Sequence, residues 1–140
     1  MRAFFITTVS GWLGAILIGM VALLPYMLRQ SPLSVRLGIT LPSRQPYLRR
    51  MWPHYWLAYA ATGLSLAHAW VLMSRSALAR ANSLGLYLAT LALSLLFLQI
   101  MLGLALQQRR LPERKAVSKW HFWTMAGVVI LVGAHIWLNE

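Results

Sequence analysis

Four long apolar stretches constrain this chain more than any other feature of its 140 residues. A helix needs about 20 apolar residues to cross the hydrocarbon of a bilayer, and runs of that length occupy about 3–28, 52–74, 84–106 and 118–138. Only 11% of the residues are charged, less than half of the roughly 25% typical of a soluble domain. The sequence therefore predicts an all-α protein, a transmembrane four-helix bundle that forms a single integral membrane domain over 1–140.

The first apolar run begins like a secretory signal, because Arg2 precedes it. It continues to Leu28, well beyond the usual apolar core of about 7–15 residues, so we expect a retained helix. The three connections carry four of the six prolines and most of the charge, and none is long enough for an extramembrane domain; they cover 30–50, 74–83 and 107–119.

The positive charges predict an orientation in the membrane. Ten of the 13 Lys and Arg lie in or beside the first and third connections, and short loops rich in cations stay on the cytoplasmic side. The other three are Arg2, Arg75 and Arg80, so both termini and the second connection are expected on the outer, periplasmic side of a bacterial cytoplasmic (inner) membrane. Topology and anionic lipid headgroups thus account for the net charge of +11, and we expect membrane lipid and no nucleic acid as a partner.

The composition removes most reactive side chains. The absence of cysteine excludes disulfides, iron–sulfur clusters, thiolate metal sites and covalent haem attachment. The two acidic side chains are Glu113, in a basic connection, and Glu140, the last residue, so no paired-carboxylate site can form. Histidine is the remaining candidate for chemistry.

All four histidines lie in the second and fourth predicted helices, as His54 with His68 and His121 with His135. The two members of each set are 14 residues apart, which at about 100° per residue returns to within about 40° of the same helix face. The two helices run in the same direction, so His54 is level with His121 and His68 with His135. The sequence predicts two facing pairs separated by a rise of about 21 Å.

Two neutral imidazoles with no carboxylate or thiolate make a poor zinc or copper site but suit the two axial positions of a haem. We therefore expect two haem b groups between the second and fourth helices as two bis-histidine layers. His54 and His121 would ligate the inner (cytoplasmic-side) haem iron, and His68 and His135 the outer one. The alternatives are a single haem with a spare histidine pair, and a structural or proton-handling role, since intramembrane histidines can also hydrogen-bond between helices.

With these four histidines, residues 52–138 resemble the four-helix core of di-haem b-type cytochromes. This group includes the cytochrome b subunit of quinol–cytochrome c reductases, cytochrome b561-type proteins and ferric-reductase-like membrane domains, in which haems bridge alternate helices. The chain lacks the Pro-Glu-Trp-Tyr segment of the respiratory subunit and has no flavin or nicotinamide domain. The resemblance implies the electron-conducting portion of such proteins, a subunit of a larger redox complex such as those of a respiratory chain.

Several cations are candidates to pair with haem propionates. Arg49, Arg50 and Lys119 lie within two turns of the inner histidines, and Arg75 lies on the outer side. The positive-inside rule already accounts for the first three.

The sequence as a whole predicts transmembrane electron transfer by an oxidoreductase subunit rather than by a complete enzyme. Quinone is a candidate electron partner, because Tyr55, Trp56 and Trp123 lie near the inner histidines, although such aromatics are more often interfacial anchors. Two alternatives stay open: a haem-free membrane anchor or structural subunit, and a self-contained cytochrome that oxidises quinol or superoxide. In the latter, Arg75 and Arg80 would attract an anionic substrate.

Overall fold

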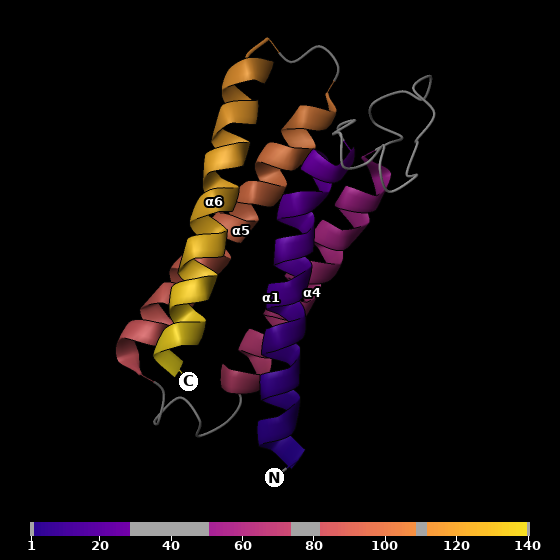
Figure 1. Ribbon diagram of the computed structural model, residues 1–140. Coiled ribbons are helices and arrows are strands. Elements are labelled where there is room, and N and C mark those ends of the chain that lie inside the picture. The colour runs from indigo at the N-terminus through magenta and orange to yellow at the C-terminus, as the bar shows by residue number, and fades with distance from the viewer. Residues whose placement is uncertain (1, 29–50, 74–81, 109–111, 140) are drawn as a thin grey trace.

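The computed structural model describes residues 2–28, 51–73, 82–108 and 112–139. Within them the chain forms four α-helices, which are α1 (Arg2–Leu28), α4 (Trp52–Met73), α5 (Ser83–Gln107) and α6 (Arg114–Asn139). The helices run alternately up and down, so α1 begins and α6 ends at the same end of the bundle (Figure 1). The predicted all-α, four-helix architecture is confirmed.

One helix boundary differs from the sequence expectation by more than one residue. α6 begins at Arg114, before the apolar run predicted from about 118. Hydropathy locates only the apolar part of a helix, whereas the hydrogen-bond ladder here extends back to the Val117 amide, which donates to the Glu113 carbonyl at 3.0 Å. The Arg114 guanidinium also donates to the Gln108 carbonyl at 3.0 Å and ties the start of α6 to the end of α5.

The helices pack as two antiparallel pairs, α1 on α4 and α5 on α6. Smaller contacts of α1 with α6 and of α4 with α5 close the bundle. Each helix therefore has two neighbours, and the two histidine-bearing helices, α4 and α6, lie diagonally across the bundle axis. Side chains on their inward faces point toward the same central space.

The interior of the bundle is built largely from small and medium-sized side chains, and the largest apolar side chains point outward. The core cluster consists of Ile18, Val21, Ala61, Leu96, Met125 and Val128. By contrast, Trp70 is 73% exposed and Trp137 is 81% exposed. A water-soluble protein would not leave so much apolar surface uncovered, whereas lipid covers it readily.

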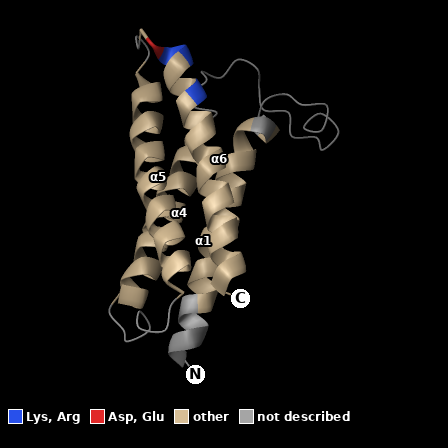
Figure 2. Ribbon diagram, turned by 90° about the vertical axis from the view of Figure 1, so that its left-hand side faces the viewer, with Lys and Arg blue, Asp and Glu red and all other residues tan. Residues whose placement is uncertain are grey.

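All four helices are long and apolar enough to cross a membrane. The charged side chains that the structure describes gather at the start of α6, where Figure 2 shows them at one end of the bundle; they are Glu113, Arg114, Lys115 and Lys119. Four apolar spans with charge kept to an end form the architecture of an integral membrane protein.

Candidate functional site

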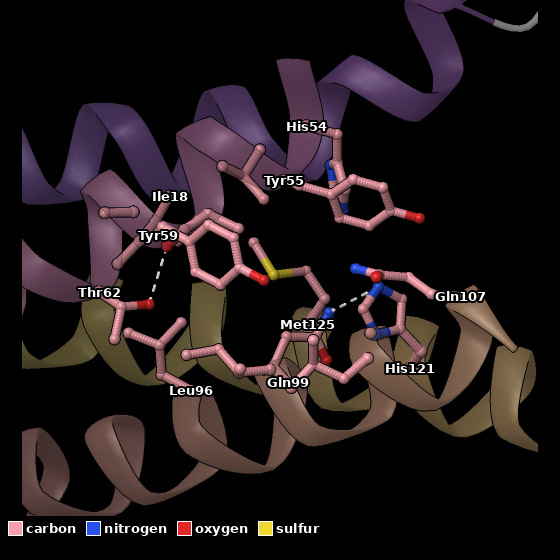
Figure 3. Close-up of a pocket in the computed structure, with 16 residues that line it drawn as sticks. Ile18, His54, Tyr55, Tyr59, Thr62, Leu96, Gln99, Gln107, His121 and Met125 are labelled. Atoms are coloured by element: carbon pink, nitrogen blue, oxygen red, sulfur yellow. Dashed lines mark hydrogen bonds between the residues drawn. The ribbon is translucent and has the colours of Figure 1, made fainter. Parts of the chain in front are cut away.

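His54 on α4 and His121 on α6 face each other across the bundle (Figure 3). Their ring centroids lie 6.3 Å apart and their ring planes cross at 69°. His54 is buried, with 8% of its surface exposed, although it lies in the first turn of α4. The structure thus brings together the two histidines that helix direction and spacing predict as neighbours.

A pocket surrounds this pair and takes its lining from all four helices. Its empty space is about 540 Å³, part of it open to the outside of the bundle. Ile18, Leu96 and Met125 contribute apolar surface, and Tyr55 lies beside His54. The pocket therefore combines an apolar lining with two imidazoles from opposite helices.

A buried polar chain supports His121. The Gln99 amide nitrogen on α5 lies 3.3 Å from His121 Nε2, and the Thr124 hydroxyl donates a short hydrogen bond to the Gln99 amide oxygen. Gln99 is 7% exposed and Thr124 is 8% exposed. The Gln99 side-chain amide thus connects the His121 ring on α6 to the Thr124 hydroxyl one turn later.

The Nδ1 atoms of the two histidines differ from His121 Nε2 in their surroundings. Among the described residues, His54 Nδ1 and His121 Nδ1 are buried and have no hydrogen-bond partner. Buried polar atoms are rarely left in this state, and a bound ion, a water molecule or a redox role is among the usual reasons. Two imidazoles that share one metal atom, each with a bond of about 2.0 Å, have ring centres about 6 Å apart, close to the 6.3 Å found here. The donor set and its spacing fit the axial positions of a haem.

His68 contacts α1. Its Nδ1 lies 3.1 Å from the Ser10 hydroxyl, and its ring rests on Gly11. A Cβ atom at Gly11 would lie 3.1 Å from His68 Cε1, so a larger residue would press on the ring. Glycine allows this close approach of imidazole and helix backbone.

His135 contacts α5. Its Nδ1 lies 2.9 Å from the Gly85 carbonyl oxygen. Asn139, one turn later, donates to the His135 carbonyl at 2.7 Å and covers Gly85, where a Cβ would lie 2.5 Å from the amide nitrogen. The recorded hydrogen bonds of His68 and His135 thus run to different helices, and their pairing around one cofactor stays a prediction.

The remaining predicted site residues fall into two groups. Lys119 is exposed near the start of α6, two residues before His121. Tyr55 lines the pocket, whereas Trp56 and Trp123 point outward with 58% and 59% exposed. Three predicted cations and one alternative substrate-attracting residue lie outside the described residues; they are Arg49, Arg50, Arg75 and Arg80.

Gln99 and Ser10 contact these histidines but are absent from the sequence-based candidates. The sequence could have identified Gln99, because an amide side chain within the apolar run Leu98-Gln99-Ile100 is costly in a membrane unless it has a hydrogen-bond partner. Ser10 carries no such signal. Hydroxyls in membrane helices usually bond their own backbone, as Thr90 does with the Leu86 carbonyl at 2.9 Å.

The resemblance to di-haem b-type cytochromes is carried by the spacing of four histidines and by helix order. Comparison of the chain with models of protein families, with curated proteins and with solved structures finds no match.

Proposed function

We propose that this chain is a di-haem b-type cytochrome subunit that relays electrons between the two faces of a membrane. His54 and His121 would hold one haem b, on the cytoplasmic side, and His68 and His135 the other, on the outer side. The observation that carries the proposal is the facing pair of His54 and His121, 6.3 Å apart in a pocket between four apolar helices.

The unsatisfied nitrogens of this pair support a resident ligand. A buried polar group without a partner costs about 1–3 kcal/mol, and within the part of the chain that the structure describes the Nδ1 atoms of both histidines are such groups. Helix packing alone gives no reason to keep two of them within one pocket. A cofactor coordinated by the imidazoles would remove that cost.

Haem held by two neutral imidazoles exchanges electrons with little movement and has no open position for oxygen. The residues of the chain would bind it, orient it and exclude water. Ile18, Leu96 and Met125 keep the pocket apolar, and Gln99 with Thr124 fixes the orientation of the His121 ring. Lys119 is a candidate propionate partner near His121.

Two layers separated by about 21 Å along the helices would give electrons a path across most of the hydrocarbon. The connections between the helices are too short to form a catalytic domain, so the proposal includes other subunits of a redox complex as electron donor or acceptor. Quinone is the small-molecule partner that we propose, and Tyr55 and Tyr59 are aromatic side chains that line the pocket.

The test is a reduced-minus-oxidised absorption spectrum of the protein purified from its native membrane, with a pyridine haemochrome assay to count haem per chain. We expect two haem b per chain in the wild type and one in His54→Ala. Thr90→Ala is the matched control, because Thr90 is exposed on α5 and bonds its own helix. A wild-type protein without haem would refute the proposal.

A second candidate, a haem-free anchor or structural subunit, is favoured by one observation. The chain Thr124, Gln99 and His121 links α5 to α6 through side-chain hydrogen bonds, and such bonds hold membrane helices together. This role predicts no Soret band and a His121→Ala variant that differs from wild type only in stability. The same haem count distinguishes the two candidates.

A further inference from the structure

The first two turns of α6 carry a pair of lysines on the outer surface of the bundle. Lys115 and Lys119 are four residues apart, so they follow one another along one face of the helix with a rise of about 6 Å. Both side chains are exposed, and Figure 2 shows the charged residues of this region at one end of the bundle. Because the apolar part of α6 begins directly after Lys119, the two ammonium groups lie at the level of the lipid headgroups.

No acidic side chain that the structure describes forms an ion pair with either lysine. The whole sequence has 13 Lys and Arg against two acidic side chains, so at least 11 cations have no acidic side chain to pair with. Two like charges one turn apart on a helix also repel each other. An anion from outside the chain would remove this repulsion.

The face that carries the two lysines continues along α6 as an apolar face. At about 100° per residue, Phe122, Trp123 and Ile130 lie within the same sector of about 100° as the lysines, and all three are exposed. The buried residues of α6 lie outside this sector; they are Thr124, Met125 and Val128. The rise from Lys119 to Ile130 is about 16 Å, close to half the thickness of the hydrocarbon core. The exposed face thus combines two cations with apolar surface as long as one leaflet is deep.

We propose that this face of α6 binds one phospholipid with an anionic headgroup. The headgroup would lie on Lys115 and Lys119, and an acyl chain would lie along Phe122, Trp123 and Ile130. A lysine ammonium binds phosphate as a point charge, and its apolar stem packs readily along an apolar helix face. An acidic segment of a partner protein would neutralise the lysines but would leave the apolar residues uncovered, whereas a phospholipid does both. The inference goes beyond the proposed function and applies to the chain with or without haem.

Lys119 is also the candidate propionate partner near His121, and Lys115 distinguishes the two roles. Lys119 and His121 are two residues apart, so they project about 200° apart on the helix, from nearly opposite faces. Lys115 is one turn farther from His121. The lipid site predicts that both lysines contribute equally, whereas a propionate role predicts an effect of Lys119 alone.

The test is native mass spectrometry of the full chain released from detergent micelles that contain either phosphatidylglycerol or phosphatidylcholine. We expect the wild type to retain one phosphatidylglycerol and to bind it more tightly than phosphatidylcholine. A basic residue beside an anionic lipid surface contributes about fivefold in affinity. Lys115→Gln and Lys119→Gln should therefore each weaken phosphatidylglycerol binding about 5-fold, and the double variant about 30-fold. Equal binding of the two lipids by the wild type would overturn the proposal.

Two variants control for the effect of charge. Lys115→Arg/Lys119→Arg keeps both charges and should bind phosphatidylglycerol as the wild type does. Arg2→Gln removes one charge at the opposite end of the bundle and should leave binding unchanged. If Arg2→Gln weakens binding as much as Lys119→Gln, the lysines act only through net charge and there is no defined site. A haem count on the same samples tests the proposed function separately, because its failure would leave the lipid result intact.

Discussion

The ring centroids of His54 and His121 lie 6.3 Å apart and the ring planes cross at 69°, although the two residues belong to helices that do not follow one another in the chain. α5 runs antiparallel to both α4 and α6, so α4 and α6 are parallel to each other. They lie diagonally across the bundle, and both rings point into its interior. Because His68 and His135 follow at equal intervals on the same two helices, the second pair should form a separate layer. The independence of the two layers can be tested.

Replacement of His68 by Ala should remove one haem and leave the other. The rise of about 21 Å along the helix separates His68 from the inner pair by several turns, so the contact of His54 with His121 should persist. A pyridine haemochrome assay should fall from two haems per chain to one, and the remaining Soret band should keep its low-spin form. Loss of both haems would argue against independent layers.

The hydrogen bond between Thr124 and Gln99 should contribute measurably to stability. Hydrogen bonds between membrane helices contribute about 0.6 kcal/mol on average and up to about 1.7 kcal/mol, and this one is buried at both ends. We expect a coupling free energy in that range from a double-mutant cycle of Thr124→Val and Gln99→Leu, measured by unfolding in mixed micelles. The same cycle with Thr90→Val in place of Thr124→Val should give no coupling, and a coupling near zero in both would refute the prediction.

The parts of this molecule that sequence predicts are those set by local physics. Apolar length determines the four spans, and the helical period of 3.6 residues places His54 and His68 on one face. Helix direction then pairs His54 with His121 without any knowledge of packing. The start of α6 at Arg114 could not be predicted from hydropathy, because Arg114 and its neighbours are polar. Their backbone nevertheless continues the helical hydrogen bonds of the apolar part of α6.

Contacts that depend on the rotation of one helix against another could not be predicted. Ser10 contacts His68 only because the face of α1 that carries Ser10 is turned toward α4. The position of Ser10 in the sequence does not distinguish it from the other hydroxyl residues. Gln99 is different, because a polar amide side chain within an apolar run is costly in a membrane and therefore predicts a hydrogen-bond partner. Which partner it has, His121 and Thr124, depends on the packing of α5 on α6.

Two glycines of α6 should respond differently to substitution by alanine. At Gly133 an added Cβ would have no atom within 4 Å among the described residues, its own helix backbone aside, so Gly133→Ala should stabilise the helix by up to about 1 kcal/mol through propensity alone. At Gly127 an added Cβ would lie 3.1 Å from Leu95 Cδ1 on α5, and the repacking should cancel that gain or reverse it. Thermal unfolding of both variants in one detergent checks the difference, and equal stabilisation of both would contradict it.

The orientation of the chain is open to a direct test, because the sequence has no native cysteine and each single-cysteine variant is uniquely labelled. Ser83 at the start of α5 and Glu113 before α6 lie at opposite ends of the bundle. The distribution of Lys and Arg predicts that Ser83→Cys faces outward and Glu113→Cys faces the cytoplasm. A membrane-impermeant maleimide should therefore modify Ser83→Cys in right-side-out vesicles and Glu113→Cys only in inverted ones. The reverse pattern would place the His54–His121 site at the outer face and exchange the sides from which the two redox partners approach.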